Sequence, residues 1–232
     1  MGQVGCSLVR EVLNLPRPRV PETDHGIVGK DLVAMYDQLQ RNLRDKGWIE
    51  TNAILKSGIT SGHALELGNG PGYLGLEWLK STRETTLTGL DISADMIALA
   101  LRNAREYGLE ERAQFVLSSG SKMPFADGAF DAVFTNGSMH EWAEPRQTFD
   151  EIWRTLRKRG RYFISDLRRD MFPLAHWFLR ISTRPKERRV GLESSIGASY
   201  TLAELRELTD GTRIEGCKIE KMAFGAIISG EK

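Results

Sequence analysis

This sequence has few cysteines, no large excess of positive or negative charge, and no long run of apolar residues. Cys6 and Cys217 are the only cysteines among 232 residues, which argues against a disulfide-built secreted fold and excludes a cysteine metal cluster. The 32 basic and 31 acidic residues leave a net charge of +1. No overall field would therefore draw the chain to nucleic acid or to a membrane surface, and any such attraction must be local.

The first 27 residues lack the apolar run of a signal peptide or a membrane span. Their apolar positions are interrupted by Arg10, Glu11 and the prolines Pro16, Pro18 and Pro21. We therefore expect an uncleaved, cytoplasmic chain without a membrane span. Because closely spaced prolines disfavour regular structure, this segment is predicted to form an extended arm.

Apolar spacing changes its period several times along the chain. Residues 28–55 show helical spacing, which predicts two helices before the first strand. Strand-like and helix-like segments then alternate, with strands at 63–67, 86–91, 114–117, 130–135 and 161–166 and helices from 73, over 94–107 and over 146–156. This alternation is typical of a parallel sheet with helices on both faces, so the predicted fold class is doubly wound α/β.

The alternation stops at residues 170–200, where apolar residues are followed by several arginines, as in an insertion. A last helix is predicted near 202–208. Two final strand-like stretches, 213–221 and 223–229, are joined too closely for a crossover helix and must be antiparallel. We expect one domain of 1–232, made of an N-terminal arm and helices (1–58), a core (59–169), the insertion (170–200) and a C-terminal helix with strands (201–232).

A glycine-rich loop joins the first predicted strand to the next helix. Gly68, Gly70 and Gly72 alternate there, and glycine lets a bound ligand approach the backbone closely. A tight turn without a ligand would not need three alternating glycines. Gly70, Gly72 and Gly75, with Asp91 after the second strand, also satisfy the pattern G-x-G-x-x-G, so nicotinamide or flavin binding is an alternative.

Four segments resemble, in the same order, the motifs of class I S-adenosylmethionine-dependent methyltransferases. They are the acid and glycines of Glu66–Gly72 and the stretches 90–96, 123–131 and 156–161. With the segment 135–140 after the fourth strand, the chain looks most like the methyltransferase type 11 group, which includes the ubiquinone and menaquinone methyltransferases. The resemblance implies a Rossmann-like, seven-stranded, mostly parallel sheet with an antiparallel C-terminal strand.

By this resemblance the chain uses S-adenosylmethionine as methyl donor and needs no metal. Gly68, Gly70 and Gly72 would line the methionine part of the donor, and Glu66 would hold the loop and help to bind the ammonium group. Asp91 would accept both ribose hydroxyls, a task that suits a carboxylate as a bidentate acceptor. The other donor-binding residues that the resemblance implies are Asn69, Ile92, Met96, Ser119 and Asn136.

Two positions depart from the pattern of the group. Ser119 stands where an acid often contacts the adenine amino group, so this contact is expected to be weaker. Lys158 and Arg159 replace a small turn before the fifth strand, away from the site. Ser93 is better placed than Asp91 to cap the following helix, which leaves Asp91 free for a ligand.

The stretch 136–142, after the fourth strand, is expected to lie beside the donor and to contact the acceptor, because ligands of α/β sheets bind at the carboxyl ends of strands. Methyl transfer is an in-line displacement with a neutral leaving group, so only the acceptor needs a base. His140 is the candidate base near neutral pH, and Glu141 would orient it or bind a substrate cation. Alternatively, His140 packs on the donor. Asp166, at the end of the fifth strand, is a weaker candidate for contact with the substrate.

The insertion 170–200 is predicted to form a lid over the acceptor pocket. The N-terminal helices around Tyr36 are expected to close over the site with it and keep water from the reacting methyl group. Apolar residues from Met171 to Phe178, including Trp177, would supply its wall. The arginines from Arg180 to Arg189 would favour an anionic acceptor if they faced the pocket. The alternative is a surface helix with solvated arginines.

The predicted function is transfer of a methyl group from S-adenosylmethionine to a small-molecule acceptor. Alternatives are an RNA methyltransferase, suggested by the basic runs 154–161 and 180–189, a non-catalytic S-adenosylmethionine-binding protein, and an NAD-dependent oxidoreductase. The sequence shows no appended RNA-binding module, and residues 136–139 do not match the motifs of enzymes that methylate bases. Nucleic acid is therefore disfavoured as a partner, while the acceptor and the oligomeric state stay open.

Overall fold

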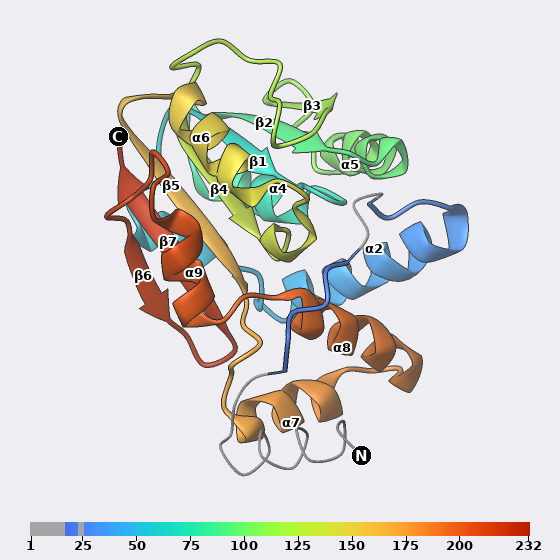
Figure 1. The fold of residues 1–232 in the computed structure, drawn as a ribbon. Coiled ribbons are helices and arrows are strands. Elements are labelled where there is room, and N and C mark those ends of the chain that lie inside the picture. Colours follow the sequence, from blue (N-terminus) through green and yellow to red (C-terminus); the bar gives the residue numbers. More distant parts are fainter. Residues whose placement is uncertain (1–16, 23–25) are drawn as a thin grey trace, which may run out of the picture.

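Seven strands form one sheet in the order β3-β2-β1-β4-β5-β7-β6 (Figure 1). The structure is a computed structural model that describes residues 17–22 and 26–232. The strands are β1 (His63–Leu67), β2 (Thr86–Asp91), β3 (Ala113–Leu117), β4 (Phe130–Asn136), β5 (Leu156–Leu167), β6 (Lys218–Lys221) and β7 (Gly225–Glu231). β1 to β5 pair in parallel, whereas β7 runs antiparallel to both β5 and β6.

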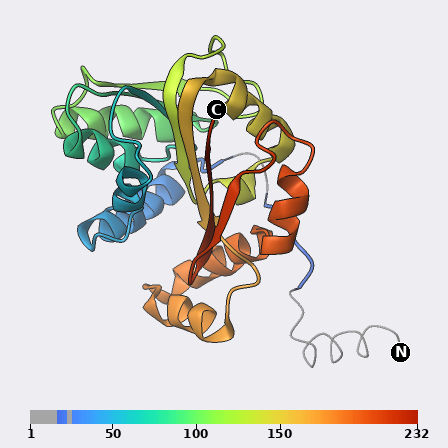
Figure 2. The ribbon, with the colours of Figure 1, turned by 90° about the vertical axis from the view of Figure 1, so that its left-hand side faces the viewer.

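Helices cover both faces of this sheet, which Figure 2 shows nearly edge-on. They are α2 (Lys30–Asp45), α3 (Thr51–Lys56), α4 (Tyr73–Ser81), α5 (Ala94–Glu106), α6 (Pro145–Thr155), α7 (Pro173–Ser182), α8 (Arg189–Ala198) and α9 (Leu202–Thr209), with short 3-10 turns η1 (Met139–Glu141) and η2 (Lys186–Arg188). Within residues 17–22 and 26–232, no helix is both long enough and apolar enough to cross a membrane.

Each central strand contributes to two separate hydrophobic cores because successive side chains point to opposite faces of a sheet. Leu65 and Val133 pack with α6 and α9 on one side. Ala64 and Phe134 pack with α3 and α4 on the other side. Burial on both faces explains why these strands read as nearly continuous apolar runs, as is usual for parallel strands between helices.

The predicted α/β fold is confirmed, including the two helices before β1 and the antiparallel final strands. The largest differences from the predicted boundaries concern the starts of β5 and β6. β5 starts at Leu156, which pairs with Phe130 before an irregularity shifts the register to Ala132 and Arg161. β6 starts at Lys218 because the preceding residues turn, although Ile214 is buried and so gave a strand-like apolar pattern.

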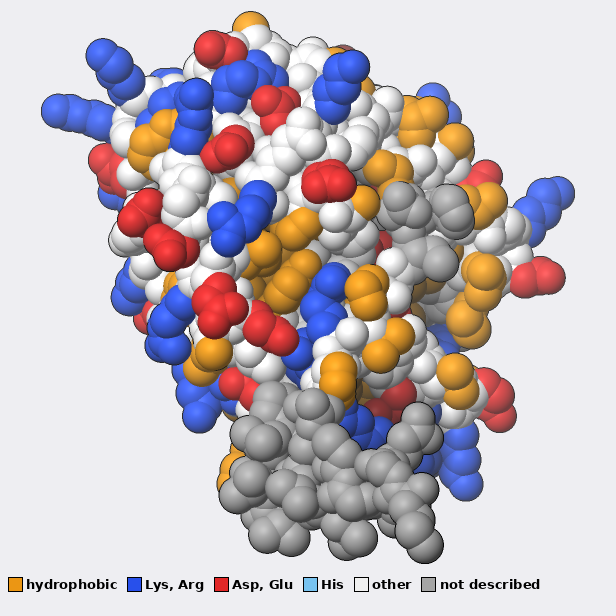
Figure 3. Space-filling view, viewed as in Figure 1, with side chains coloured by type: hydrophobic (Ala, Val, Ile, Leu, Met, Phe, Trp, Pro, Cys, Tyr) orange, Lys and Arg blue, Asp and Glu red, His pale blue; other side chains and the backbone are white. Residues whose placement is uncertain are grey.

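The surface carries charges of both signs. Figure 3 shows Lys and Arg side chains lying among Asp and Glu side chains on the described part of one face. This mixture agrees with the net charge of +1. An extended basic stripe of the kind that holds a nucleic-acid backbone is not seen among the described residues of this face.

Candidate functional site

A cavity opens at the carboxyl ends of β1, β2 and β4, where the strand order reverses between β1 and β4. Such a switch point is the usual ligand site of an open α/β sheet. Its lining comes from the N-terminal segment, α2, the strand ends and η1, namely Gly26, Ile27, Tyr36, Leu67, Gly68, Gly70, Leu90, Asp91, Ile92, Met96, Ser119, Gly120, Ser121, Gly137, Ser138, Glu141, Trp142, Ala143, Glu144 and Thr148.

The glycine loop after β1 forms the floor of this cavity. Gly68, Gly70 and Gly72 have positive φ angles of 61°, 49° and 82°, a backbone region that side chains strongly disfavour. A Cβ atom on Gly68 would lie 2.5 Å from the Cβ of Ser138, so the loop and the segment after β4 approach too closely for any other residue. The loop therefore needs its first glycine for packing as well as for conformation.

Glu66 lies beneath the loop, in the interior. Its side chain is buried, with a residue exposure of 2%, and lies against the backbone of Gly75. Burial raises the pKa of this carboxyl to about 8. A Cβ on Gly75 would lie 2.3 Å from Glu66 Oε2. Close packing of α4 on β1 thus explains why residue 75 is a glycine. The G-x-G-x-x-G pattern that includes Gly75 can therefore be explained without a nicotinamide or flavin cofactor.

Asp91, at the carboxyl end of β2, lines the cavity and also shapes it. Its two oxygens accept hydrogen bonds from the backbone N–H groups of Gly70 (2.8 Å) and Ser93 (2.9 Å). Burial raises the pKa of Asp91, and these hydrogen bonds oppose the rise. Ser93 caps α5 by accepting from the Met96 N–H, as expected, and ligand binding by Asp91 stays a prediction.

Six of the ten donor-binding residues that the sequence predicted lie in the lining of the cavity, namely Gly68, Gly70, Asp91, Ile92, Met96 and Ser119. The other four lie outside the lining as described. Glu66 lies below the loop, Asn69 donates to the Gly70 carbonyl (2.7 Å), Gly72 begins α4, and Asn136 accepts from the Ser165 hydroxyl (2.8 Å). Donor contacts for these four stay predictions.

Sequence reasoning did not assign a large part of the lining. Ile27 and Tyr36 come from segments far from the glycine loop in sequence, and Trp142 and Thr148 follow η1. Tyr36 lies on the N-terminal helices that were expected to close over the site, and Trp142 ends the stretch 136–142 that was expected beside the donor. Ile27 and Thr148 lie in segments that the sequence did not place at the site.

His140 is held in a fixed orientation behind the cavity. Its backbone N–H donates to Asp166 Oδ2 (2.8 Å), and its Nδ1 lies 2.9 Å from Asp166 Oδ1. The residue has an exposure of only 4%. Asp166, proposed from sequence as a minor contact of the substrate, is thus the partner that positions His140.

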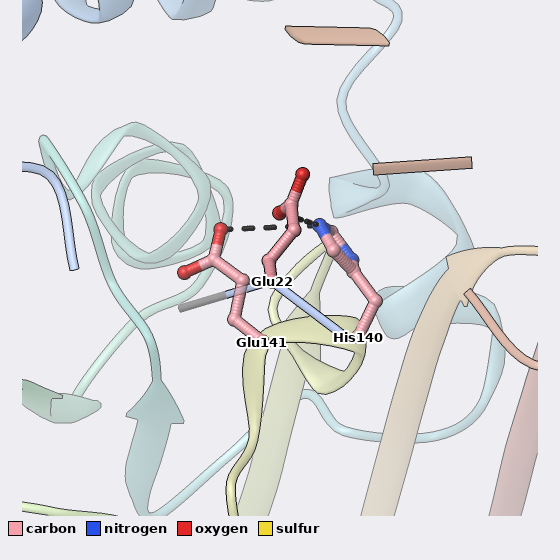
Figure 4. A group of neighbouring side chains, drawn as sticks. All are labelled: Glu22, His140 and Glu141. Atoms are coloured by element: carbon pink, nitrogen blue, oxygen red, sulfur yellow. Dashed lines mark ion pairs between the residues drawn. The ribbon is translucent and has the colours of Figure 1, made fainter. Parts of the chain in front are cut away.

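The other ring nitrogen of His140 points toward two further carboxylates (Figure 4). His140 Nε2 lies 3.5 Å from Glu22 Oε2 and 3.8 Å from Glu141 Oε1. Burial by itself would lower the pKa of His140, but the carboxylates of Asp166, Glu141 and Glu22 raise it overall. The raised pKa keeps the His140 ring charged at pH values above neutrality. The sequence had suggested a base that titrates near neutral pH. Burial also raises the pKa of Glu141.

Residues 17–22 form neither helix nor strand and lie beside this cluster, as predicted for that part of the arm, whereas residues 1–16 and 23–25 of the predicted arm lie outside the described residues. Val20 N–H donates to the Gly197 carbonyl (3.0 Å). Arg19 donates to the carbonyl oxygens of Ala198 (2.6 Å) and His140 (3.0 Å). The arm thereby fixes Glu22 beside His140, and Pro16 lies outside the described residues.

The insertion 170–200 folds as α7, η2 and α8, beyond the carboxyl end of β5 (Figure 1). α8 packs against η1, whereas Phe172 and Trp177 on α7 are 67% and 57% exposed. In the described structure no residue of the insertion lines the cavity, so the apolar wall stays a prediction. Arg188 is buried and donates to Gln38 (3.0 Å), whereas Arg180 is exposed. The arginines therefore do not share one direction.

Residues 65–164, which contain the glycine loop, Asp91 and η1, match the family model described as a methyltransferase domain. Residues 65–164 of this chain thus form a methyltransferase domain, as the resemblance implied. It is similar to a demethylmenaquinone methyltransferase of Roseiflexus sp., with 29% identity over 58% of this chain and 56% of the relative. It is also similar to a fatty-acid O-methyltransferase of Mycolicibacterium smegmatis, with 28% identity over 75% of this chain and 59% of the relative.

The chain thus spans somewhat over half the length of these curated relatives. Among solved structures, the fold resembles that of a candidate S-adenosyl-L-methionine-dependent methyltransferase from Methanococcus maripaludis, with a TM-score of 0.71 and 23% identity. That match covers 87% of this chain and 92% of the other. The methyltransferase fold therefore extends beyond residues 65–164, over most of the chain.

Proposed function

We propose that this methyltransferase transfers a methyl group from S-adenosylmethionine to a small-molecule acceptor. One observation carries the proposal: the glycine loop and Asp91 share a single cavity with Glu141, the neighbour of His140. A donor bound on the loop and an acceptor beside η1 would then lie within the same enclosed space. Proximity and alignment of this kind supply much of the rate enhancement in displacement reactions.

The reaction needs little acid or base chemistry on the donor side. An electron pair of the acceptor forms the new bond to the methyl carbon, while the electron pair of the breaking C–S bond returns to sulfur. The sulfonium becomes a neutral thioether, so the leaving group needs no proton. We propose that the pair His140 and Glu141 acts on the acceptor, whose proton must leave when a hydroxyl is methylated.

The donor-binding residues proposed here are those of the sequence motif. Gly68 and Gly70 would contact the methionine part through the backbone, and Asp91 would accept the ribose hydroxyls with the acceptor capacity left beyond its two backbone contacts. Ile92 and Ser119 lie where an adenine ring would bind, between the ends of β2 and β3. Glu66 would act from below the loop by fixing its shape.

A small molecule fits the site better than RNA does. The lining combines Trp142 and Met96 with a few polar groups, as is usual for small-molecule sites. The mixed charges of the surface in Figure 3 offer no continuous path for a phosphate backbone on the described part of that face. The curated relatives named above act on demethylmenaquinone and on fatty acids by their names. The second name specifies an oxygen acceptor, and we propose a hydroxyl or carboxyl acceptor by analogy with it.

Calorimetric titration with S-adenosylmethionine, S-adenosylhomocysteine and NAD tests the donor. We expect both sulfur compounds to bind and NAD to give no heat of binding. Binding of NAD alone would overturn the proposal. A screen of metabolite extracts with donor labelled in its methyl group then tests turnover, and donor binding without any labelled product would leave the non-catalytic alternative.

A further inference from the structure

Three side chains from two distant segments point their ligand atoms at one another (Figure 4). Glu22 comes from the N-terminal arm, and His140 and Glu141 come from η1. One oxygen of each glutamate and one nitrogen of the imidazole all lie within 4.8 Å of one another. The arm is tied to η1 through Arg19, so this arrangement is built by specific contacts.

The spacing of these atoms is too wide for hydrogen bonds. His140 Nε2 lies 3.5 Å from Glu22 and 3.8 Å from Glu141, whereas N–H···O bonds are about 2.7 to 3.2 Å long. Nε2 is buried and has no hydrogen-bond partner among the described residues. A buried polar atom without a partner is costly, so its direction toward two carboxylates points to a missing ligand.

The same spacing is close to that of atoms that share a metal ion. Metal bonds to imidazole and carboxylate are about 2.0 to 2.2 Å long, which places neighbouring ligand atoms roughly 3.0 to 3.5 Å apart. The two distances from His140 Nε2, 3.5 and 3.8 Å, need to shorten by about 0.8 Å or less, and the two glutamate oxygens, at most 4.8 Å apart, by at most about 1.8 Å. Glu22 lies on an arm outside the sheet and helices, so this contraction requires no change in the core.

Asp166 orients His140 for this purpose. Its carboxylate lies 2.9 Å from Nδ1, which leaves the lone pair of Nε2 facing the glutamates when Nδ1 carries the proton. Histidine ligands of metals commonly have such a carboxylate on the far ring nitrogen. With Asp166, Glu22 and Glu141, three carboxylates surround one imidazole, and a divalent cation would balance this excess of negative charge.

We propose that Glu22, His140 and Glu141 bind a divalent transition-metal ion such as Mn²⁺ or Zn²⁺. A set of one imidazole and two carboxylates favours these ions over Mg²⁺ and Ca²⁺, which prefer oxygen ligands alone. Because Glu141 also lines the donor cavity, the open coordination positions face the place of the acceptor. There the ion would bind an acceptor oxygen and lower the pKa of its hydroxyl. Only this last step rests on the proposed function.

Metal binding can be measured without turnover. Tag-free full-length protein, stripped with chelator, is titrated with Mn²⁺ and Zn²⁺ by calorimetry, and free Mn²⁺ is followed by its electron paramagnetic resonance signal. We expect one ion per chain. Glu22→Gln and Glu141→Gln should each weaken binding at least about tenfold, and Asp166→Asn, which removes the orienting carboxylate, about 10- to 100-fold.

The chain offers a matched control. His176 and Glu193 form a second His–Glu pair, 3.0 Å apart, on the surface of α7 and α8, and His176→Ala should leave metal binding unchanged. Circular dichroism checks that each variant is folded, and Glu22→Gln is the decisive one because its side chain lies outside the core.

Two outcomes would overturn the metal site: no saturable binding of either ion to the wild-type protein, or binding that Glu22→Gln and Glu141→Gln leave intact. Donor titration of the chelator-treated protein separates this failure from that of the proposed function. If S-adenosylmethionine binds and Mn²⁺ does not, the donor site stands and the metal site falls. If an ion binds saturably and the donor does not bind, the metal site stands and the proposed function falls.

Discussion

The donor side of the cavity takes most of its residues from one stretch, 66–96, whereas the acceptor side joins segments 17–22, 138–142 and 166. Backbone groups and glycines shape the donor side, and charged side chains shape the acceptor side. The glycine loop is fixed by the end of β1 and the start of α4, so its shape should tolerate changes of single side chains nearby. The geometry of the charged cluster around His140 should instead depend on each of its side chains.

This contrast suggests separate tasks for the two sides. Donor binding requires a constant surface for a ligand shared across the family, and the buried cores beneath β1 and β2 provide it. Acceptor chemistry requires charges placed beside the reacting atom, and long-range contacts assemble these. Changes on the acceptor side should therefore affect rate, and changes on the donor side should affect affinity and stability.

The largest expected effect follows from His140→Ala. Loss of a group that acts on the acceptor should slow turnover by about 10² to 10⁴. Donor affinity should change little, because His140 lies behind the cavity and contacts Asp166 rather than the glycine loop. Single-turnover rates and donor calorimetry on the same variant separate the two quantities, once an acceptor is found.

His176→Ala is the control for that experiment and should match the wild type in both measurements. In the wild-type protein without added metal, the rate should rise with pH beyond neutrality, because the surrounding carboxylates keep His140 protonated there. A variant that loses donor affinity at an unchanged rate would show instead that His140 packs on the donor.

The next effect concerns the donor side and pH. Burial raises the pKa of Glu66 from 4.5 to about 8, so the folded state keeps a proton that the unfolded state has already released. The free energy of unfolding should therefore fall as pH rises between about 5 and 8. At 1.36 kcal/mol per pKa unit, the loss is of order 3 to 5 kcal/mol.

Glu66→Gln should remove this part of the pH dependence, because an amide has nearly the same shape as the carboxyl group and does not ionise. Urea unfolding of both proteins at pH 5 and pH 8.5, without donor, measures the difference. Contributions from Asp91 and the histidines cancel in that comparison. Equal slopes for the two proteins would contradict a neutral, buried Glu66.

The same contrast explains what the sequence could predict. Alternating apolar periods predicted the sheet and its helices, and separate motifs that resemble those of the methyltransferases predicted six of the residues that line the cavity, such as Gly68 and Asp91. The helices around Tyr36 were expected over the site, but periodicity defines a helix face and no partner, so it could not show that Tyr36 itself lines the cavity. Glu22 and Asp166 reach His140 through contacts between distant segments, for which one sequence carries no local signal.

A smaller effect is expected from Asp91→Ala, which should weaken donor binding by about 1.5 to 3 kcal/mol, the usual loss of hydrogen bonds to a charged group. Calorimetry with S-adenosylhomocysteine measures this loss. Asp127→Ala is a suitable control because Asp127 lies on the surface and pairs with Arg154. Unchanged affinity in a folded Asp91→Ala protein would exclude recognition of the ribose by this carboxylate.

The smallest effect should come from Ser93, which connects the donor side with the N-terminal segment. Its hydroxyl accepts from the Met96 N–H at the start of α5 (3.3 Å) and donates to the Ile27 carbonyl (2.5 Å). Ser93→Ala should lower the free energy of unfolding by about 1 kcal/mol, the usual loss for a helix cap.

Because Ile27 lines the cavity, loss of this second bond should also speed amide exchange at residues 26–29. Ser93→Thr keeps a hydroxyl and should restore most of the stability. Hydrogen exchange followed by mass spectrometry compares both variants with the wild type. If Ser93→Ala lost stability while exchange at 26–29 stayed as in the wild type, Ser93 would be a helix cap alone. The N-terminal segment would then be held over the donor side by other contacts, such as that between Gly29 N–H and Asp95 (2.9 Å).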